Sequence, residues 1–193
     1  MGNLTQLATV KSRLGISDTT DDTLLTNLIK FASGRFERET NRLFDRQADI
    51  TDEFSADTCE LCVTRYPIES VSAFHLKTNE TEGWVAETGV EFLIRRACIV
   101  SLFFPLGVCS QLVRVTFTGG YVLPGTTPGS GQTALPDDLE QACVEQVSFW
   151  YQRRHQLGLI TVPSDGRTFY QLGQIDLLPN VVPVLKKYER YVV

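Results

Sequence analysis

Apolar residues recur at helical spacing in the first 44 residues of the chain. Four of them predict a short first helix that ends at Gly15: Leu4, Leu7, Val10 and Leu14. The polar and acidic run at 17–22 then supplies residues that favour a helix start. A broad apolar stripe from Leu24 to Phe36 predicts a second helix that ends near Asn41. The chain therefore begins with a helical hairpin.

The hydrophobic period falls to two between about residues 45 and 122. The clearest strand is 112–118, where apolar and polar residues alternate before Gly119-Gly120 ends the run. Further short strands are expected in five segments: 59–64, 71–76, 84–87, 91–95 and 98–103. This pattern predicts a β-rich insertion over residues 45–122.

Residues 123–136 contain three prolines and three glycines, which predicts a flexible, exposed loop. Pro136-Asp137-Asp138 then starts a long helix that is expected to end at Gly158. A short hairpin over 159–172 and a last short helix from near Pro179 follow. The predicted fold is α+β: a bundle of about four helices with the β-rich insertion between the second and third main helices. It is treated as one domain, with a helical core from 1–44 and 137–193.

The net charge of −5, from 18 basic and 23 acidic residues, argues against a strongly cationic nucleic-acid binder. The acidity is concentrated at 45–136, which carries 6 basic and 11 acidic residues. A DNA-binding regulator that uses Arg35, Arg38 and Arg42 stays open as a weaker alternative. The N-terminus has no secretory pattern, and the most apolar stretch, 98–109, is too short to span a bilayer.

Candidate chemistry is sparse. The five cysteines, an odd number in a chain of ordinary size, favour free thiols in a reducing cytoplasm. Cys59 and Cys62 form a C-x-x-C motif, but in a strand they would lie on opposite faces and could not easily chelate a metal or form a disulfide. Cys143 and His155 are ~18 Å apart along the expected helix, too far for a catalytic pair. We predict no catalytic residue, no metal site and no cofactor.

Six segments occur in a characteristic order: VKSRLGI at 10–16, a helical segment at 24–44, YPIESV at 66–71, VTFTGGY at 115–121, LPDDLEQAC at 135–143 and a final stretch at 178–188. Their order and spacing resemble the head–tail connector proteins of tailed bacteriophages, the adaptor or head-completion family. The resemblance implies a non-enzymatic virion protein that assembles in the bacterial cytoplasm into a ring, commonly a dodecamer, in the neck. Its implied partners are other copies of itself, the portal and a tail or stopper protein, with DNA passing through the lumen.

A candidate portal or subunit interface follows from the aromatic and basic residues near the last two helix ends: Trp150, Tyr151, Arg153, Arg154, Lys186, Lys187, Tyr188 and Tyr191. Two alternatives remain open. One is a stopper or tail-terminator ring, which differs from an adaptor only in its binding partner. The other is a small thiol- or zinc-dependent enzyme that uses Cys59, Cys62 and a histidine.

Overall fold

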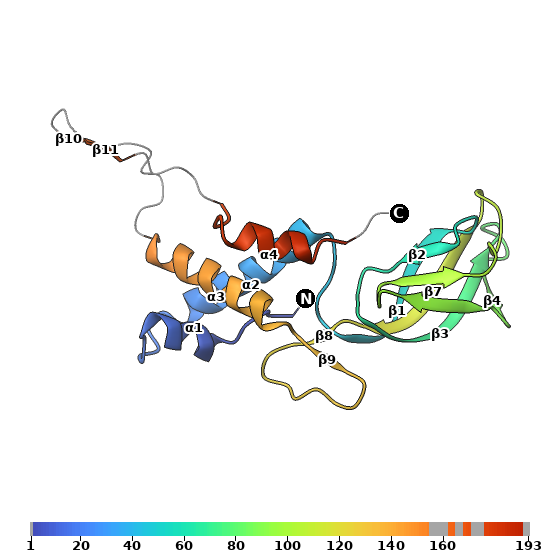
Figure 1. Ribbon diagram of the computed structural model, residues 1–193, viewed down its shortest axis with the longest axis horizontal. Helices are drawn as coiled ribbons and strands as arrows, with labels where there is room; N and C mark the ends of the chain where they lie inside the picture. The colour runs from blue at the N-terminus through green and yellow to red at the C-terminus, as the bar shows by residue number, and fades with distance from the viewer. Residues whose placement is uncertain (1, 155–161, 165–167, 171–175, 191–193) are drawn as a thin grey trace.

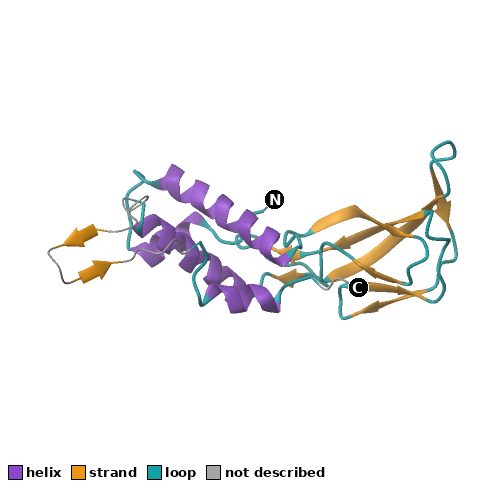
Figure 2. Ribbon diagram, turned by 90° about the horizontal axis from the view of Figure 1, so that it is seen from above, coloured by secondary structure: helices purple, strands orange, loops and turns teal. Residues whose placement is uncertain are grey.

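The computed structural model describes residues 2–154, 162–164, 168–170 and 176–190. Four helices form a bundle at one end of an elongated molecule (Figures 1 and 2): α1 (Leu7–Leu14), α2 (Asp22–Thr40), α3 (Asp137–Gln152) and α4 (Val181–Lys187). Helices α1 and α2 end at the residues that the sequence predicted. Gly15 (φ 69°) and Asn41 (φ 50°) adopt the left-handed conformation and donate their N–H groups to carbonyls of the preceding turn.

The other end of the molecule is a β unit of two antiparallel sheets (Figure 1). The larger sheet has the order β1-β7-β3-β4, with β1 (Gln47–Ser55), β7 (Leu112–Gly119), β3 (Ile68–Lys77) and β4 (Trp84–Glu87). The smaller has the order β2-β6-β5, with β2 (Glu60–Cys62), β6 (Ile99–Leu102) and β5 (Phe92–Arg95). Two short pairs complete the described strands: β8 (Tyr121–Val122) with β9 (Thr133–Ala134), and β10 (Val162–Ser164) with β11 (Thr168–Tyr170).

Each end of the molecule has its own hydrophobic core. Helices α1 to α4 bury a common set of side chains that includes Leu25, Ile29, Phe36, Phe44, Leu139, Val147 and Leu185. The β unit buries a second set that includes Leu61, Val63, Phe74, Val100, Val113, Val115 and Phe117. The alternation of apolar and polar residues predicted strand β7 well, because every second residue of this strand is buried.

The predicted α+β class and the β-rich region between the second and third helices are confirmed. Several boundaries differ. Helix α1 begins at Leu7 rather than Leu4, and α3 ends at Gln152 rather than Gly158. The expected loop 123–136 contains β9, which pairs in parallel with β8. Strand β1 was not predicted, because its sequence is polar and it gains its strand conformation by pairing with β7.

The two cores neither confirm nor contradict a single domain, which stays a prediction. No helix among the described residues has the length and apolarity needed to cross a membrane.

Candidate interaction surfaces

The helical bundle and the β unit meet at a junction formed by the segments 42–46, 63–67 and 119–122. Tyr121 N–H donates to the Phe44 carbonyl at 2.7 Å, and Gly120 N–H donates to the Pro67 carbonyl at 3.0 Å. A side chain at Gly119 would lie 2.9 Å from the carbonyl oxygens of Arg65 and Pro67. Gly120 itself has φ +107°. The Gly-Gly pair is therefore required by the close crossing of three backbone segments.

Arg42 fills the centre of this junction and is only 3% exposed. Its guanidinium carbon lies 3.3 Å from the centroid of the Tyr66 ring and 5.3 Å from that of Tyr121. Its Nη2 donates to the Tyr66 carbonyl, whereas its Nε has no hydrogen-bond partner among the described residues. Arg42 thus binds the bundle to the β unit by stacking and hydrogen bonding.

The three arginines of the DNA-binding alternative do not form one basic surface. Arg42 is buried, and Arg35 pairs with Glu39 at 2.9 Å and with Asp176 at 2.5 Å. Only Arg38 is exposed without an ion pair in the described part of the chain. The geometry does not favour phosphate binding by this set.

The predicted interface residues at the end of α4 join that helix to the first turn of α3. Lys187 Nζ and the Tyr188 hydroxyl donate to the Asp138 carboxylate at 2.8 and 2.5 Å. Burial alone would raise the pKa of Asp138, but these two hydrogen bonds hold that pKa below its ordinary value. Burial, and then the bond to Asp138, raise the pKa of Tyr188. Lys186 is exposed, and Tyr191 lies outside the described residues.

The predicted residues at the end of α3 are also engaged within the subunit. The Trp150 indole N–H donates to the Asp176 carbonyl at 3.2 Å, and the Tyr151 hydroxyl donates to the Asp21 carboxylate. The guanidinium of Arg154 lies 3.9 Å from the Tyr151 ring centroid. That of Arg153 is 5.1 Å from the Phe149 ring centroid.

The structure does not bring the two halves of the predicted interface together. Lys187 and Tyr188 contact Asp138 in the first turn of α3, whereas Trp150 and Tyr151 lie in its last turn. At a rise of 1.5 Å per residue these positions are separated by ~20 Å. The seven predicted interface residues that the structure describes therefore lie at two separate places on the bundle.

A groove of about 560 Å³ lies along α2 next to the junction. It is lined by Lys30, Phe31, Gly34, Glu37, Arg38, Asn41, Arg42, Leu43 and Thr64. Phe31 is 53% exposed and its ring packs against Trp150 at 5.1 Å. The α2 stripe indicated only the buried face of this helix. The groove was missed because it also needs Leu43 and Thr64, whose position depends on the junction.

Glu37 lies in the wall of this groove and is only 5% exposed, with one carboxylate oxygen accepting from Phe44 N–H at 3.3 Å. Burial raises the pKa of Glu37 above its ordinary value of 4.5. A carboxyl with a raised pKa favours the folded state fully below pH 4.5. This contribution is lost as the pH rises through the raised pKa.

Replacing Glu37 with glutamine is therefore expected to remove this loss, because glutamine keeps the accepting oxygen without a charge. The free energy of unfolding of Glu37→Gln minus that of the natural chain should therefore be larger at about pH 7 than at about pH 4. Urea unfolding of both proteins at the two pH values measures this difference. Glu39→Gln, an exposed change on the same helix, is the control and should show no such rise. An equal effect of Glu37→Gln at both pH values would contradict the assignment.

Several large apolar side chains of the β unit are exposed. In the loop between β6 and β7, Phe103 is 55% exposed, Phe104 77% and Val108 57%. Leu93 in the edge strand β5 is 53% exposed. The sequence marked 98–109 only as its most apolar stretch.

The thiols do not form the pair or the metal site that an enzyme would need. All five cysteines are free. The C-x-x-C residue Cys62 packs with Cys98 rather than with Cys59. Burial raises the pKa of Cys98, and it raises that of Cys143 to about 12, so both thiols are held protonated. The described residues contain no group of three or more His, Cys, Asp or Glu placed to hold a metal ion.

A sequence model of the head completion protein family matches residues 3–191. Since the match spans almost the whole chain, the protein belongs to the head completion protein family, which confirms the resemblance seen in its motifs. No curated protein matches the chain closely enough to count as a relative.

The fold recurs in gene transfer agent (GTA) particles. A chain in the neck of the empty GTA particle, computed with C6 symmetry, has a TM-score of 0.57 and 14% identity, covering 97% of this chain and 90% of that one. A chain in the virion of the native particle has a TM-score of 0.55 and 16% identity, covering 97% of this chain and 90% of that one. A chain in the native neck, computed with C12 symmetry, has the same TM-score and identity and covers 97% of this chain and 89% of that one. At these identities the likeness establishes a shared fold.

Proposed function

We propose that this protein is a structural component of a tailed-phage virion that forms a ring between the portal and the tail. The observation that carries the proposal is the head completion family match over residues 3–191. The ring would extend the DNA channel at the portal vertex and present a docking surface for the tail or a stopper protein.

The shape of the subunit supports this role. A bundle at one end and a β unit at the other give it two different ends, joined by the Arg42 junction (Figures 1 and 2). Closed rings form through heterologous contacts, which need two unlike surfaces on each subunit. The C6 and C12 symmetry applied to the structurally similar necks supports a ring of twelve. The net charge of −5 suits a lumen that lets DNA pass without holding it.

Among the alternatives, a stopper or tail-terminator ring differs only in its partner. The thiol or zinc enzyme is the least supported. Its Cys62 is buried with Cys98, and the described residues contain no group of three or more His, Cys, Asp or Glu placed to hold a metal ion.

Electron microscopy of the chain mixed with the portal from the same genome tests the proposal. We expect an added ring of density on the portal, absent from portal alone. Adding the tail-side protein should then extend the assembly in an adaptor, whereas a tail-terminator ring would bind tail tubes and leave the portal bare. A chain that stays monomeric with both partners would overturn the ring.

A further inference from the structure

We propose that the α2 groove of one subunit receives the acidic β3–β4 hairpin loop, residues 78–83, of a second copy of this chain. The inference rests on the ring proposed above and names a contact that would close it. Three observations carry it: two unpaired cations at the groove, two acidic residues at the hairpin tip and the distance between them within one subunit.

The groove side is cationic. Lys30, Gly34, Glu37, Arg38 and Asn41 recur at helical spacing and therefore share one face of α2. Lys30 and Arg38 are exposed, and neither forms an ion pair among the described residues. Beneath them lies the buried guanidinium of Arg42, whose Nε has no hydrogen-bond partner in the described part of the chain.

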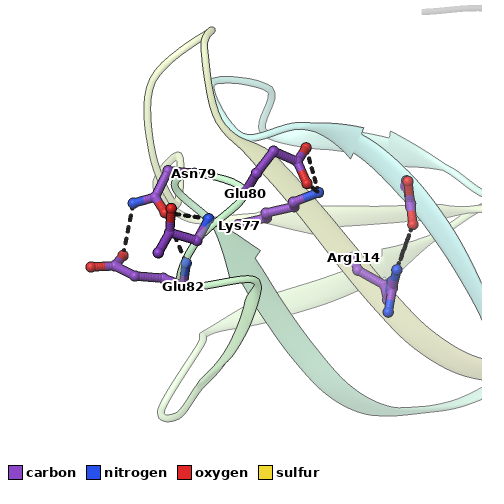
Figure 3. A network of polar contacts seen from close by, with 7 residues as sticks. Lys77, Asn79, Glu80, Glu82 and Arg114 are labelled. Carbon is purple, nitrogen blue, oxygen red and sulfur yellow. Dashed lines mark hydrogen bonds and ion pairs between the residues drawn. The ribbon is translucent and has the colours of Figure 1, made fainter.

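The hairpin side is acidic and preorganised (Figure 3). The Asn79 side-chain oxygen accepts from the N–H groups of Thr81 and Glu82 at 2.9 and 2.8 Å, which fixes the turn. The Glu80 side chain is 90% exposed and bonded to Lys77 at 2.7 Å. Among the described residues Glu82 accepts only from uncharged groups, Thr78 Oγ1 at 2.7 Å and Asn79 Nδ2 at 3.1 Å, so no cation of these residues neutralises its charge.

Glu82 differs in this respect from several acidic residues of the β unit and the junction, each of which already pairs with an arginine. The pairs are Asp45–Arg65, Glu69–Arg46, Glu53–Arg114 and Glu60–Arg95. A loop that is already ordered loses little conformational entropy on binding. The 78–83 loop thus combines a fixed shape with one carboxylate, Glu82, that has no cationic partner among the described residues, and a second, Glu80, that is paired there only with Lys77 of its own hairpin.

The hairpin cannot reach the groove of its own subunit. Strand β3 runs from Ile68, at the junction, to Lys77, so the loop lies ~30 Å from the junction at the usual rise per strand residue. Figure 1 shows β4 at the end of the molecule opposite the helices. The contact is therefore between copies and head-to-tail, which is the type that closes a ring.

Charge reversal tests the contact in the full-length chain, assembled alone and on the portal. Glu80→Lys with Glu82→Lys, or Lys30→Glu with Arg38→Glu, is expected to raise the concentration for half-maximal ring assembly at least about tenfold. Combining all four changes restores complementary charges and is expected to restore assembly. Glu80→Lys alone leaves the Asn79 turn intact and should act in the same direction. High salt should weaken ring assembly both by the natural chain and by the variant that carries all four changes.

Asp57→Lys with Glu91→Lys is the matched control, because it makes the same change in net charge at exposed positions elsewhere on the β unit. It is expected to assemble like the natural chain. Thermal unfolding should be unchanged in every variant, since all the altered side chains are exposed. The hairpin–groove contact is overturned if the natural chain forms rings and the charge reversals do not change their assembly. It is also overturned if the variant with all four changes assembles no more readily than either double variant. If the natural chain forms no ring on the portal, the proposed function fails as well.

Discussion

Replacing Phe36 with alanine is expected to lower the free energy of unfolding by about 3–5 kcal/mol. Phe36 is 0% exposed in the middle of the bundle core, where α2 packs against α3. Truncating its ring removes a large apolar area and leaves a cavity, because the helices around it are held by other core side chains and cannot close the space.

The matched control is Phe31→Ala on the same helix, where the ring is 53% exposed and touches Trp150. This change should cost about 1 kcal/mol or less. The chain has two tryptophans, Trp150 in the bundle and Trp84 in the β unit. Urea unfolding followed by fluorescence, with the other tryptophan replaced by phenylalanine, reports each end separately. Phe36→Ala should shift the Trp150 transition most. Equal costs for Phe36→Ala and Phe31→Ala would contradict the core assignment.

Replacing Arg42 with alanine is expected to cost about 3 kcal/mol and to uncouple the two ends of the molecule. The change removes a desolvated cation–π contact with Tyr66, worth ~2 kcal/mol, and a charged hydrogen bond to its carbonyl, worth ~1.5 kcal/mol or more. It also opens the packing between Phe44 and Tyr121. The Trp84 and Trp150 transitions should then separate, whereas they should lie closer together in the natural chain.

Arg38→Ala, one helical turn earlier and exposed, is the control and should change stability by no more than about 0.5 kcal/mol. Arg42→Lys keeps the charge but loses the planar stack, so its cost should lie between the two. If Arg42→Ala lowers the free energy of unfolding as little as Arg38→Ala does, or leaves the two tryptophan transitions unchanged, Arg42 is not the residue that joins the two ends.

The elements that the sequence predicted best are those whose signals are local. Gly15 and Asn41 end their helices as expected, because a left-handed residue satisfies the last carbonyls of its own helix. Strand β7 follows its alternation, since period two exposes every second residue. In strand β1 the inward positions are Ile50, Asp52 and Phe54, so a carboxylate interrupts the apolar series. This segment is a strand because β7 supplies its backbone hydrogen bonds, and those come from a segment more than fifty residues away.

The interface predicted from the helix ends stays a prediction, and the structure adds contacts that the sequence does not show. Aromatic and basic residues near the helix ends suggested one interface, but Tyr151 and Tyr188 are used in hydrogen bonds within the subunit. Arg42 resembles an ordinary cation at the end of an exposed helix. Its burial depends on Tyr66 and Tyr121, which lie far along the chain, so no local pattern contains that information.

By itself the sequence determined the α+β class, the order of helices and strands, and, through its ordered motifs, the head completion family. These follow from hydrophobic period, capping residues and short segments that each depend on neighbours in the chain. Only the tertiary structure decided that the bundle and the β unit have separate cores, that Arg42 joins them, and that a groove with unpaired cations lies beside that joint. Each of these features arises where segments distant in the sequence come into contact. Whether a side chain there is buried or paired depends on both segments, so neither segment alone predicts it.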